Sequence, residues 1–417
     1  MTTTKRPTNN RLLISLCSLL LLASSVVVHG RYFGGPDGSQ QLLQDQDLFD
    51  IDGSLPNGNG NVPISALEGS LDQPAIVDEE MPDGLSFSVK NALLVSSRAQ
   101  ENIEWAKLSA GSLAKYGQVA GVAASADCLF AFHRGGVQWN DSSFNPETNV
   151  YNYQNKPIAA NTVVALDPVT GEEMFAWGNN SFYMPHGISV DPQGNIWLTD
   201  VALHQAFRFK KNNFDVADLV LGERFVPGSD DKHFCKPTDV AISSTGVVYV
   251  SDGYCNSRVA IFSARGAYLT EIGHNDKMLI PHSMSLLEIE DLLCVADREN
   301  GRILCYNAGL ANYRDVGKLL FEVTPSQNPA QKLYAIGHIG DVILALNGGA
   351  DQTKGLSVDL ATEQIVDTWA PANGSVFHQA HDLTVAHDGR SFYVCQFDAG
   401  QKVVKFDMIE TTPMFMN

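Results

Sequence analysis

Three histidines of this chain occupy the same position in a recurring sequence pattern, and their chemistry is that of metal ligands. His186 lies in "YMPHGISVD", His282 in "IPHSMSLLE" and His381 in "QAHDLTVA", each at the start of a short apolar run. A fourth copy, "CKPTDVAISSTGVVYVSD", carries Thr238 at this position. Three neutral imidazoles with one open coordination position form a common ligand set for a catalytic zinc ion. If the fold brings the three histidines together, the sequence predicts a zinc centre.

The pattern repeats along most of the chain and indicates how the histidines could meet. Each copy has room for four short strands separated by turn residues, and the copies recur about every 50 residues, which is typical of a β-propeller. A β-sandwich, the alternative, would not repeat its turn residues at such intervals. We predict an all-β fold, a six-bladed β-propeller with NHL-like repeats, in which alternate innermost strands lie about 120° apart and bring the histidines to the central channel. The first positions of the six copies are Gly121, His186, Thr238, His282, approximately Ala335, and His381.

The two ends of the chain differ in composition from this body. Three basic residues precede the uncharged apolar segment 12–28, which predicts a signal peptide, with a retained signal anchor as the alternative. Residues 31–84 hold eleven Asp or Glu against one Arg, and this composition is typical of a flexible segment. The expected parts are a signal peptide (1–30), an acidic flexible leader (31–100), the propeller (101–410, with a short helix near residue 105) and a C-terminal tail (411–417).

Composition also bears on location and partners. A net charge of −19 over 417 residues argues against nucleic acid or an anionic membrane surface as a partner. No segment after the signal peptide is apolar enough to span a bilayer, so we expect the protein in the secretory pathway lumen, in secretory granules or outside the cell. The sequence gives no sign of oligomerisation, and we expect a monomer. The seven cysteines fit an oxidising compartment. Acceptor patterns for N-glycosylation occur at Asn140, Asn179 and Asn373.

Four of the cysteines could form local disulfides. Cys294 and Cys305 flank a predicted hairpin, so a bridge across it could form. Cys235 and Cys255 stand at the two ends of one copy and could close a loop of about twenty residues. Sequence alone does not fix the connectivity, and it leaves open the state of Cys128 and Cys395.

Longer motifs point to one family. The segments "FHRGGVQW", "WLTDVALHQAF", "HFCKPTDVA", "VSDGYCNSR" and "CVADRENGRILC" resemble the peptidyl-α-hydroxyglycine α-amidating lyases, over a region from about Glu104 to Phe406. This resemblance implies cleavage of a C-terminal peptidyl-α-hydroxyglycine into a peptide amide and glyoxylate. It implies a catalytic zinc on the three histidines. It also implies a structural calcium held by the backbone carbonyls of Val122 and Ile188 and by the carboxylate of Asp382, which would otherwise be read as a partner of the neighbouring zinc ligand.

The resemblance assigns three further residues as catalytic and substrate-binding. Arg134 in "HRGG" and Arg298 in "DREN" match the family's substrate-binding arginines, and a guanidinium suits the carboxylate at the end of such a substrate. Tyr254 in "DGYCN" matches the catalytic tyrosine, which could remove the hydroxyl proton as the carbon–nitrogen bond opens. Without the family, Arg298 would be read as a salt-bridge residue and Tyr254 as a packing residue. The resemblance also implies the disulfides Cys235–Cys255 and Cys294–Cys305.

Two features depart from the usual family pattern. Gln379 and Ala380 stand where the family has Met-Pro before the third histidine, so substrate fit or turnover could differ. The leader is too short for a copper monooxygenase domain, so we expect a stand-alone lyase that acts on peptides hydroxylated by a separate copper monooxygenase.

Two alternative functions remain open on the sequence alone. The propeller could be a non-catalytic module that binds peptide or carbohydrate, or a calcium-dependent, lactonase-like hydrolase. A zinc measurement separates the lyase from the binding module. The lactonase-type site uses carboxylate and Asn ligands, whereas the predicted axis of this chain is rich in histidine.

Overall fold

The described part of the chain is the propeller. The computed structural model describes residues 97–410 except 327, 329, 350–352, 373–375 and 398–399. The predicted signal peptide, nearly all of the leader, the tail and Asn373 therefore lie outside the described residues. Among the described residues, no helix has the length and apolar character needed to cross a membrane.

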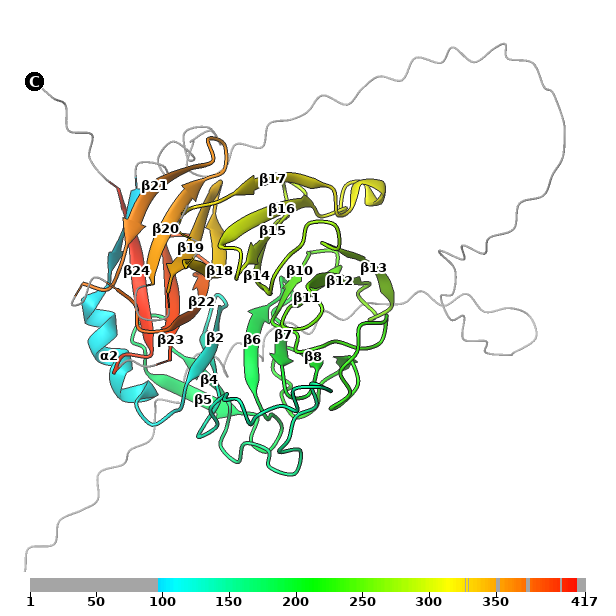
Figure 1. Ribbon diagram of the computed structural model, residues 1–417. Helices are drawn as coiled ribbons and strands as arrows, with labels where there is room; N and C mark the ends of the chain where they lie inside the picture. Colours follow the sequence, from blue (N-terminus) through cyan, green and yellow to red (C-terminus); the bar gives the residue numbers. More distant parts are fainter. Residues whose placement is uncertain are drawn as a thin grey trace, which may run out of the picture. The chain divides into compact units, whose positions relative to one another are not determined.

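The described strands form six four-stranded antiparallel sheets arranged around a central axis, which confirms the predicted six-bladed propeller (Figure 1). Consecutive innermost strands contact one another around the ring, and the last of them contacts the first. The blades, from the innermost strand outwards, are β2 (Val119–Ala124), β3 (Leu129–His133), β4 (Val163–Leu166) and β5 (Glu173–Trp177) in blade 1; β6 (Pro185–Val190), β7 (Ile196–Asp200), β8 (Gln205–Phe209) and β9 (Leu219–Leu221) in blade 2; β10 (Asp239–Ile242), β11 (Val248–Asp252), β12 (Arg258–Phe262) and β13 (Tyr268–Ile272) in blade 3; β14 (Pro281–Leu287), β15 (Leu292–Asp297), β16 (Arg302–Asn307) and β17 (Leu319–Val323) in blade 4; and β18 (Lys332–Ile339), β19 (Val342–Gly348), β20 (Lys354–Asp359) and β21 (Gln364–Trp369) in blade 5.

Blade 6 is built from both ends of the described chain. It contains β22 (Ala380–Val385), β23 (Ser391–Gln396) and β24 (Val403–Glu410), and its outermost strand is β1 (Ser97–Glu101), paired with β24. The predicted start of the propeller at residue 101 is therefore too late by this one strand. A strand from the N-terminal side closes the ring and covers the free edge of β24. The predicted helix follows as α2 (Ile103–Leu113), and its first turn is capped by the Asn102 side chain, which accepts from the Trp105 amide at 2.9 Å.

Each innermost strand except β10 carries an irregularity in its pairing near its start, and the histidines occupy it. The ladder skips Ala120, Tyr334, His282 and His381, and it skips His186 together with the following glycine. A bulged residue is released from the pleat, so its side chain can be turned toward a site. The equivalent positions in blades 1 and 5 are thus Ala120 and Tyr334. The predicted first positions Gly121 and Ala335 are wrong by one residue, because the sequence pattern does not show the bulge.

In four of the six blades, a polar side chain at the end of the second strand fixes the segment just before the innermost strand. Asp200 accepts hydrogen bonds from the amides of Tyr183 and Met184 at 2.7 and 3.0 Å. The same contact recurs in three other blades, where a side chain accepts from the amide three residues before the position equivalent to His186: Asp252 from Cys235, Asp297 from Leu279 and Gln396 from His378. The recurring Thr-Asp and Ser-Asp motifs therefore position the innermost strands.

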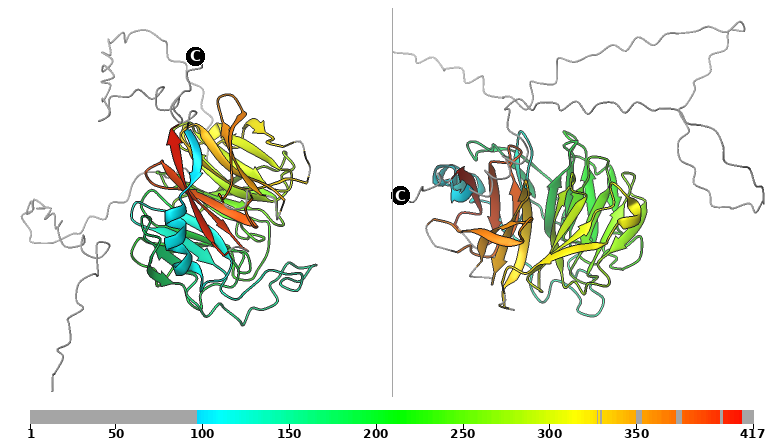
Figure 2. Two further views of the ribbon diagram at one scale, coloured as in Figure 1. Left: turned by 90° about the vertical axis from the view of Figure 1, so that its left-hand side faces the viewer. Right: turned by 90° about the horizontal axis from the view of Figure 1, so that it is seen from above.

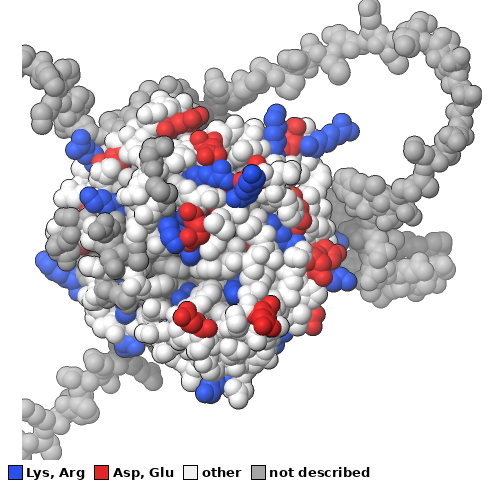
Figure 3. All heavy atoms as spheres, viewed as in Figure 1, with Lys and Arg blue, Asp and Glu red and all other residues white. Residues whose placement is uncertain are grey.

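Neighbouring blades are held together by apolar side chains that interdigitate between their faces. Between blades 1 and 2, for example, Phe132, Phe182 and Phe209 belong to one buried cluster. The side views show the blades standing edge-on around the channel (Figure 2). On the face seen in Figure 3, Lys and Arg are interspersed with Asp and Glu, and that face presents no continuous basic surface of the kind that binds nucleic acid.

Candidate active site

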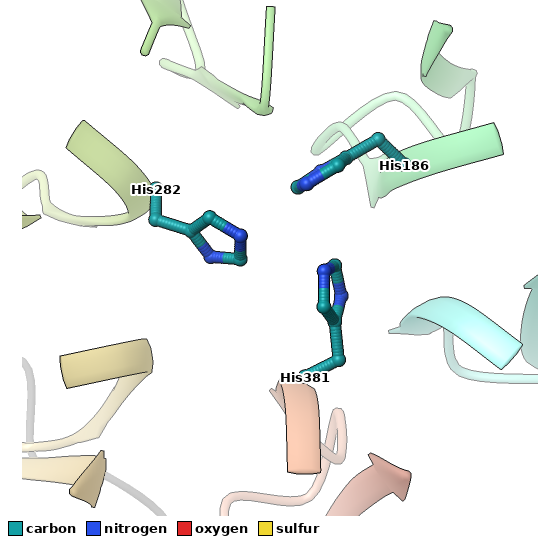
Figure 4. A group of neighbouring side chains, drawn as sticks. All are labelled: His186, His282 and His381. Carbon is teal, nitrogen blue, oxygen red and sulfur yellow. The ribbon is translucent and has the colours of Figure 1, made fainter. Parts of the chain in front are cut away.

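His186, His282 and His381 meet in the central channel. Their ring centroids lie 4.7 to 4.8 Å apart in all three pairs, and their ligand atoms all fall within 4.8 Å of one another. Figure 4 shows the three rings projecting toward a common point from three different strands. All three side chains are buried. This is the only group of its kind among the described residues, and its spacing would suit one ion bound between the rings.

The blades between the histidine-bearing blades orient the rings. The Nδ1 atoms of His186, His282 and His381 lie 2.8, 2.6 and 2.6 Å from the backbone carbonyls of Thr238, Tyr334 and Ala120. A carbonyl can only accept, so each Nδ1 carries the proton and each Nε2 has a free lone pair. The three carbonyls come from the equivalent positions of blades 3, 5 and 1. The intervening copies supply the backbone carbonyls that fix the tautomer of each histidine, a contact that sequence reasoning missed.

Close approach of the strands makes this contact possible. A Cβ atom at Gly187 would lie 2.3 Å from the Thr238 carbonyl oxygen, the same oxygen that accepts from His186. Any side chain at this position would push the two innermost strands apart. The glycine of the "PHG" motif is therefore required by the orientation of its neighbouring histidine.

The electrostatic environment keeps the histidines neutral. Desolvation on burial holds the pKa of each imidazole well below its usual 6.5. Nearby arginine side chains lower all three pKa values further, and neighbouring histidines add to this at His186 and His381. Neutral imidazole is the form that binds a metal. Three buried neutral nitrogens with free lone pairs match the donor set of a catalytic zinc ion, and the residues present therefore fit the predicted metal.

Tyr254 stands directly beside the three histidines. Its hydroxyl lies 3.0 Å from Nε2 of His186 and 3.4 Å from Nε2 of His282. On its other side, Nη1 of Arg298 donates to the same hydroxyl oxygen at 3.3 Å. Arg298 is in turn held by Glu299, whose Oε1 accepts from both Nε and Nη2. The structure thus brings two of the predicted catalytic residues together at the open side of the histidine cluster.

Arg134 is a buried guanidinium without a carboxylate partner in the described part of the chain. Its Nε donates to the carbonyl of Pro185 at 2.9 Å, and the guanidinium lies 4.9 Å from the ring centroid of Phe397. Burial lowers the pKa of this guanidinium from its usual value. A buried cation gains most from an anionic partner, and Arg134 is therefore the arginine best prepared to receive one.

The two arginines occupy equivalent places in opposite blades. Each is the first residue after a second strand, and each amide donates to the carbonyl two residues before the bulge, Arg134 to Gln118 at 2.9 Å and Arg298 to Ile280 at 3.1 Å. Ile280 is a β-branched residue with a φ of 63°, a conformation that costs free energy and is held by the surrounding contacts. Gln379 holds the same place before His381, with a φ of 54°.

Comparison with known proteins identifies the family. The NHL repeat model matches residues 182–205 and 234–262. The chain is 38% identical over 287 residues to peptidyl-alpha-hydroxyglycine alpha-amidating lyase 2 of Drosophila melanogaster, which covers 67% of this chain and 69% of the relative. The chain belongs to the peptidyl-α-hydroxyglycine α-amidating lyases. A probable amidating lyase of Caenorhabditis elegans is 34% identical over 285 residues, covering 66% of this chain and 79% of that protein.

A longer relative contains the same region. The peptidylglycine alpha-amidating monooxygenase of Rattus norvegicus is 37% identical over 309 residues, covering 70% of this chain and 30% of that protein. The family assignment confirms the resemblance seen in the sequence. The amidating lyase is an enzyme of peptide amidation that breaks a carbon–nitrogen bond, which decides against the binding module and the lactonase-like hydrolase.

A second group of oxygen ligands lies along the channel of the lyase. A cavity of about 290 Å³ is lined by Val122, Ile188 and Asp382, the predicted calcium ligands, and also by Asp239. Oδ2 of Asp382 accepts from the Val122 amide at 2.9 Å, and Oδ2 of Asp239 accepts from the Met284 amide at 2.8 Å in the same manner. The two carboxylates come from blades 6 and 3, on opposite sides of the ring.

No cationic side chain of the described residues lowers the pKa of either of these two carboxyl groups. Burial raises the pKa of Asp382 well above its usual value, and the charge of Asp239 raises it further. Burial also raises the pKa of Asp239, to about 6. The carboxyl oxygens of Asp382 and Asp239, which line this one cavity, are of the kind that calcium accepts. Sequence reasoning missed Asp239, although "TD" in blade 3 stands in register with "HD" in blade 6.

Both predicted disulfides of the lyase are present. Cys235–Cys255 joins residues 20 apart in sequence and flanks Tyr254, and Cys294–Cys305 joins register partners on β15 and β16. Cys128 and Cys395 are buried and belong to neither disulfide. The glycosylation acceptors Asn140 and Asn179 are exposed.

We expect the first disulfide to support turnover through Tyr254. In the double variant C235S/C255S, the free energy of unfolding should fall by about 3 kcal/mol, the value for a loop of this length, and kcat should fall because Tyr254 is held less firmly. The matched control C294S/C305S should lose about as much stability with kcat unchanged, since the β15–β16 ladder already holds its residues. Denaturant unfolding and steady-state kinetics below the unfolding range would measure both. An equal loss of kcat in the two variants would contradict the positioning role.

Proposed function

We propose that this lyase is zinc-dependent and converts C-terminal peptidyl-α-hydroxyglycine into a peptide amide and glyoxylate during the maturation of neuropeptides and peptide hormones. The observation that carries the proposal is the convergence of three Nε2 atoms, each turned to the axis by a carbonyl on its Nδ1, beside the hydroxyl of Tyr254. The family membership supplies the reaction class.

His186, His282 and His381 would hold the zinc ion through Nε2. When bound, zinc would supply a Lewis acid that draws electron density from the substrate's hydroxyl oxygen and favours loss of its proton. The residues around it supply the remaining functions of binding and proton transfer.

Arg134 would bind the carboxylate of the terminal α-hydroxyglycine. Its guanidinium is buried, has no carboxylate partner among the described residues and can form a paired, charge-assisted hydrogen bond with the substrate. Binding there fixes the terminal residue and directs its hydroxyl toward Tyr254. Arg298, already paired with Glu299, would serve mainly to hold the oxygen of Tyr254 and to stabilise its negative charge.

Tyr254 would act as the base and then as the acid. Once its own phenol proton has been lost to solvent, the oxygen of Tyr254 would take the proton of the substrate hydroxyl, and the electron pair of that O–H bond forms the carbonyl of glyoxylate. The carbon–nitrogen bond breaks, its electron pair goes to the amide nitrogen, and Tyr254 returns the proton to that nitrogen. The reaction needs no water and no redox partner, and Tyr254 returns to its initial protonation state.

The further context follows from the same chemistry. The α-hydroxyglycine must be made by hydroxylation of a glycine-extended peptide, so we propose that a separate copper monooxygenase supplies the substrate. The two disulfides and the exposed Asn140 and Asn179 support a location in the secretory lumen or outside the cell. Val122, Ile188, Asp382 and Asp239 would hold a structural calcium ion.

The decisive experiment measures products and metal in the same preparation. Purified protein never exposed to a chelator should contain about one zinc per chain and should release glyoxylate and amidated peptide in equal amounts from an α-hydroxyglycine-extended peptide. The matching glycine-extended peptide should release none. Chelation should stop release, and zinc, but not calcium, should restore it. A preparation that holds no zinc yet retains full activity would refute zinc dependence.

A further inference from the structure

Four aromatic side chains surround the site on its open side. Trp139, Tyr254, Tyr334 and Phe397 are each half-buried, and we call them the aromatic collar. Trp139 packs on Tyr254 with ring centroids 4.7 Å apart, and Phe397 stacks on His381 at 4.6 Å. They come from blades 1, 3, 5 and 6, so the collar extends around most of the channel.

The two arginines fill the spaces between these rings. The Arg134 guanidinium lies 4.9 Å from the centroid of Phe397 and 5.9 Å from that of Trp139. The Arg298 guanidinium lies 5.3 Å from the centroid of Tyr254 and 5.9 Å from that of Tyr334. The result is an arc in the order Phe397, Arg134, Trp139, Tyr254, Arg298 and Tyr334, in which aromatic rings form the larger part.

Trp139 is held in place by a long connection, residues 134–162 between β3 and β4. Trp139 packs on Phe144 at 5.1 Å, and Nζ of Lys236 from blade 3 lies 4.4 Å from the Phe144 centroid. The same Nζ donates to Oδ1 of Asn149 at 2.8 Å. Ordered loops of this length are usually functional, and this one is fastened to Lys236 at blade 3. Trp139 is therefore preorganised as a wall of the site.

We propose that the aromatic collar binds an apolar side chain on the residue that precedes the α-hydroxyglycine, with Trp139 as the main specificity-determining residue. This inference rests on the proposed function. With the terminal carboxylate on Arg134 and the hydroxyl at Tyr254, the rest of the peptide must leave the channel past the collar. Its first side chain is the group that meets these rings.

The charges beside the collar favour an apolar over an acidic side chain. Arg134 would already hold the substrate carboxylate, and Arg298 is paired with Glu299, which also binds Lys332. An acidic side chain would therefore find no unpaired arginine at the collar. It would either be repelled by Glu299 or compete with the terminal carboxylate for Arg134, and either outcome slows the reaction.

The test compares three acetylated dipeptides that end in α-hydroxyglycine and differ only in the preceding residue, Phe, Gly or Asp. For the unaltered enzyme, kcat/KM for the Phe peptide should exceed that for the Gly peptide by about tenfold, the value of partly burying a phenyl ring, and the Asp peptide should be slowest. In W139A the Phe-to-Gly ratio should fall toward one, chiefly through a higher KM for the Phe peptide, and W139F should restore part of it. Y153A, which removes an exposed aromatic from the same connection, should keep the full ratio.

The outcomes distinguish a failure of the aromatic-collar proposal from a failure of the proposed lyase reaction. Activity on N-acetyl-α-hydroxyglycine, which has no preceding residue, reports the proposed reaction alone. Failure to release glyoxylate from this substrate and from all three peptides would overturn the proposed function and the collar with it. If that substrate is cleaved and W139A lowers kcat for all peptides by one factor with the Phe-to-Gly ratio intact, Trp139 only positions Tyr254 and the collar proposal is wrong.

Discussion

Replacing His282 with alanine is expected to abolish glyoxylate release and to lower the zinc content far below one ion per chain. Two imidazoles would remain where a catalytic zinc needs three protein ligands. The Lewis acid contributes several kcal/mol to the transition state, so turnover should fall by about a thousandfold or more. Metal analysis and a glyoxylate assay on the same preparation would measure both effects.

The channel offers a matched control for this variant. His338 on β18 is half-buried, and its Nδ1 lies 2.8 Å from the Ser285 hydroxyl, outside the histidine cluster. H338A should therefore keep its zinc. Full turnover by H282A, or zinc loss of equal size in H338A, would show that the metal is held elsewhere.

The second large effect is expected from Tyr254→Phe, which removes one oxygen and leaves the ring that packs on Trp139 in place. The variant should retain its zinc, because the three histidines and the carbonyls behind them are untouched. Release should slow by about a hundredfold to ten-thousandfold, the usual contribution of a positioned general base. The loss should fall on kcat more than on KM, since Arg134 would still bind the substrate carboxylate.

Tyr151→Phe provides the comparison for this change. Tyr151 is a buried tyrosine on the connection that carries Trp139, and its ring packs on Phe144 rather than at the histidine cluster. Its variant should turn over normally. Normal turnover by the Tyr254→Phe protein would remove Tyr254 from the mechanism and return the role of base to another group.

Both predictions depend on an arrangement in which each catalytic ligand is supported by the next blade. The Nδ1 contacts place a backbone carbonyl behind each of the three histidines. Loss of a group that hydrogen-bonds to a metal ligand commonly lowers metal affinity by about tenfold to a hundredfold. A change that shifts the Thr238 or Tyr334 backbone should therefore weaken metal binding at the proposed zinc site without touching a ligand. Around the ring, blades that supply a histidine therefore alternate with blades that supply the carbonyl behind it.

The sequence by itself determined the repeat and the residues that carry chemistry. A period near 50 residues and recurring turn motifs predicted six blades, and histidine in every second copy predicted three ligands on one axis. The residue types can be read from the sequence without any structure. In a closed ring of similar repeats, equivalent positions lie at equivalent places around the axis, so their arrangement follows from the repeat. The residues made the two disulfides possible pairings, because each joins nearby segments of one repeat, and the resemblance to the family selected them.

The tertiary structure alone decided how those residues are held. The bulges that turn the histidines inward shifted the register to Ala120 and Tyr334, and a bulge has no reliable sequence signal. The carbonyls behind the imidazoles are backbone atoms, which every residue carries alike. Asp239 opposite Asp382, and β1 beside β24, depend on contacts between segments far apart in the chain. Those contacts are set by the curvature and closure of the whole ring, which a local pattern of residues does not encode.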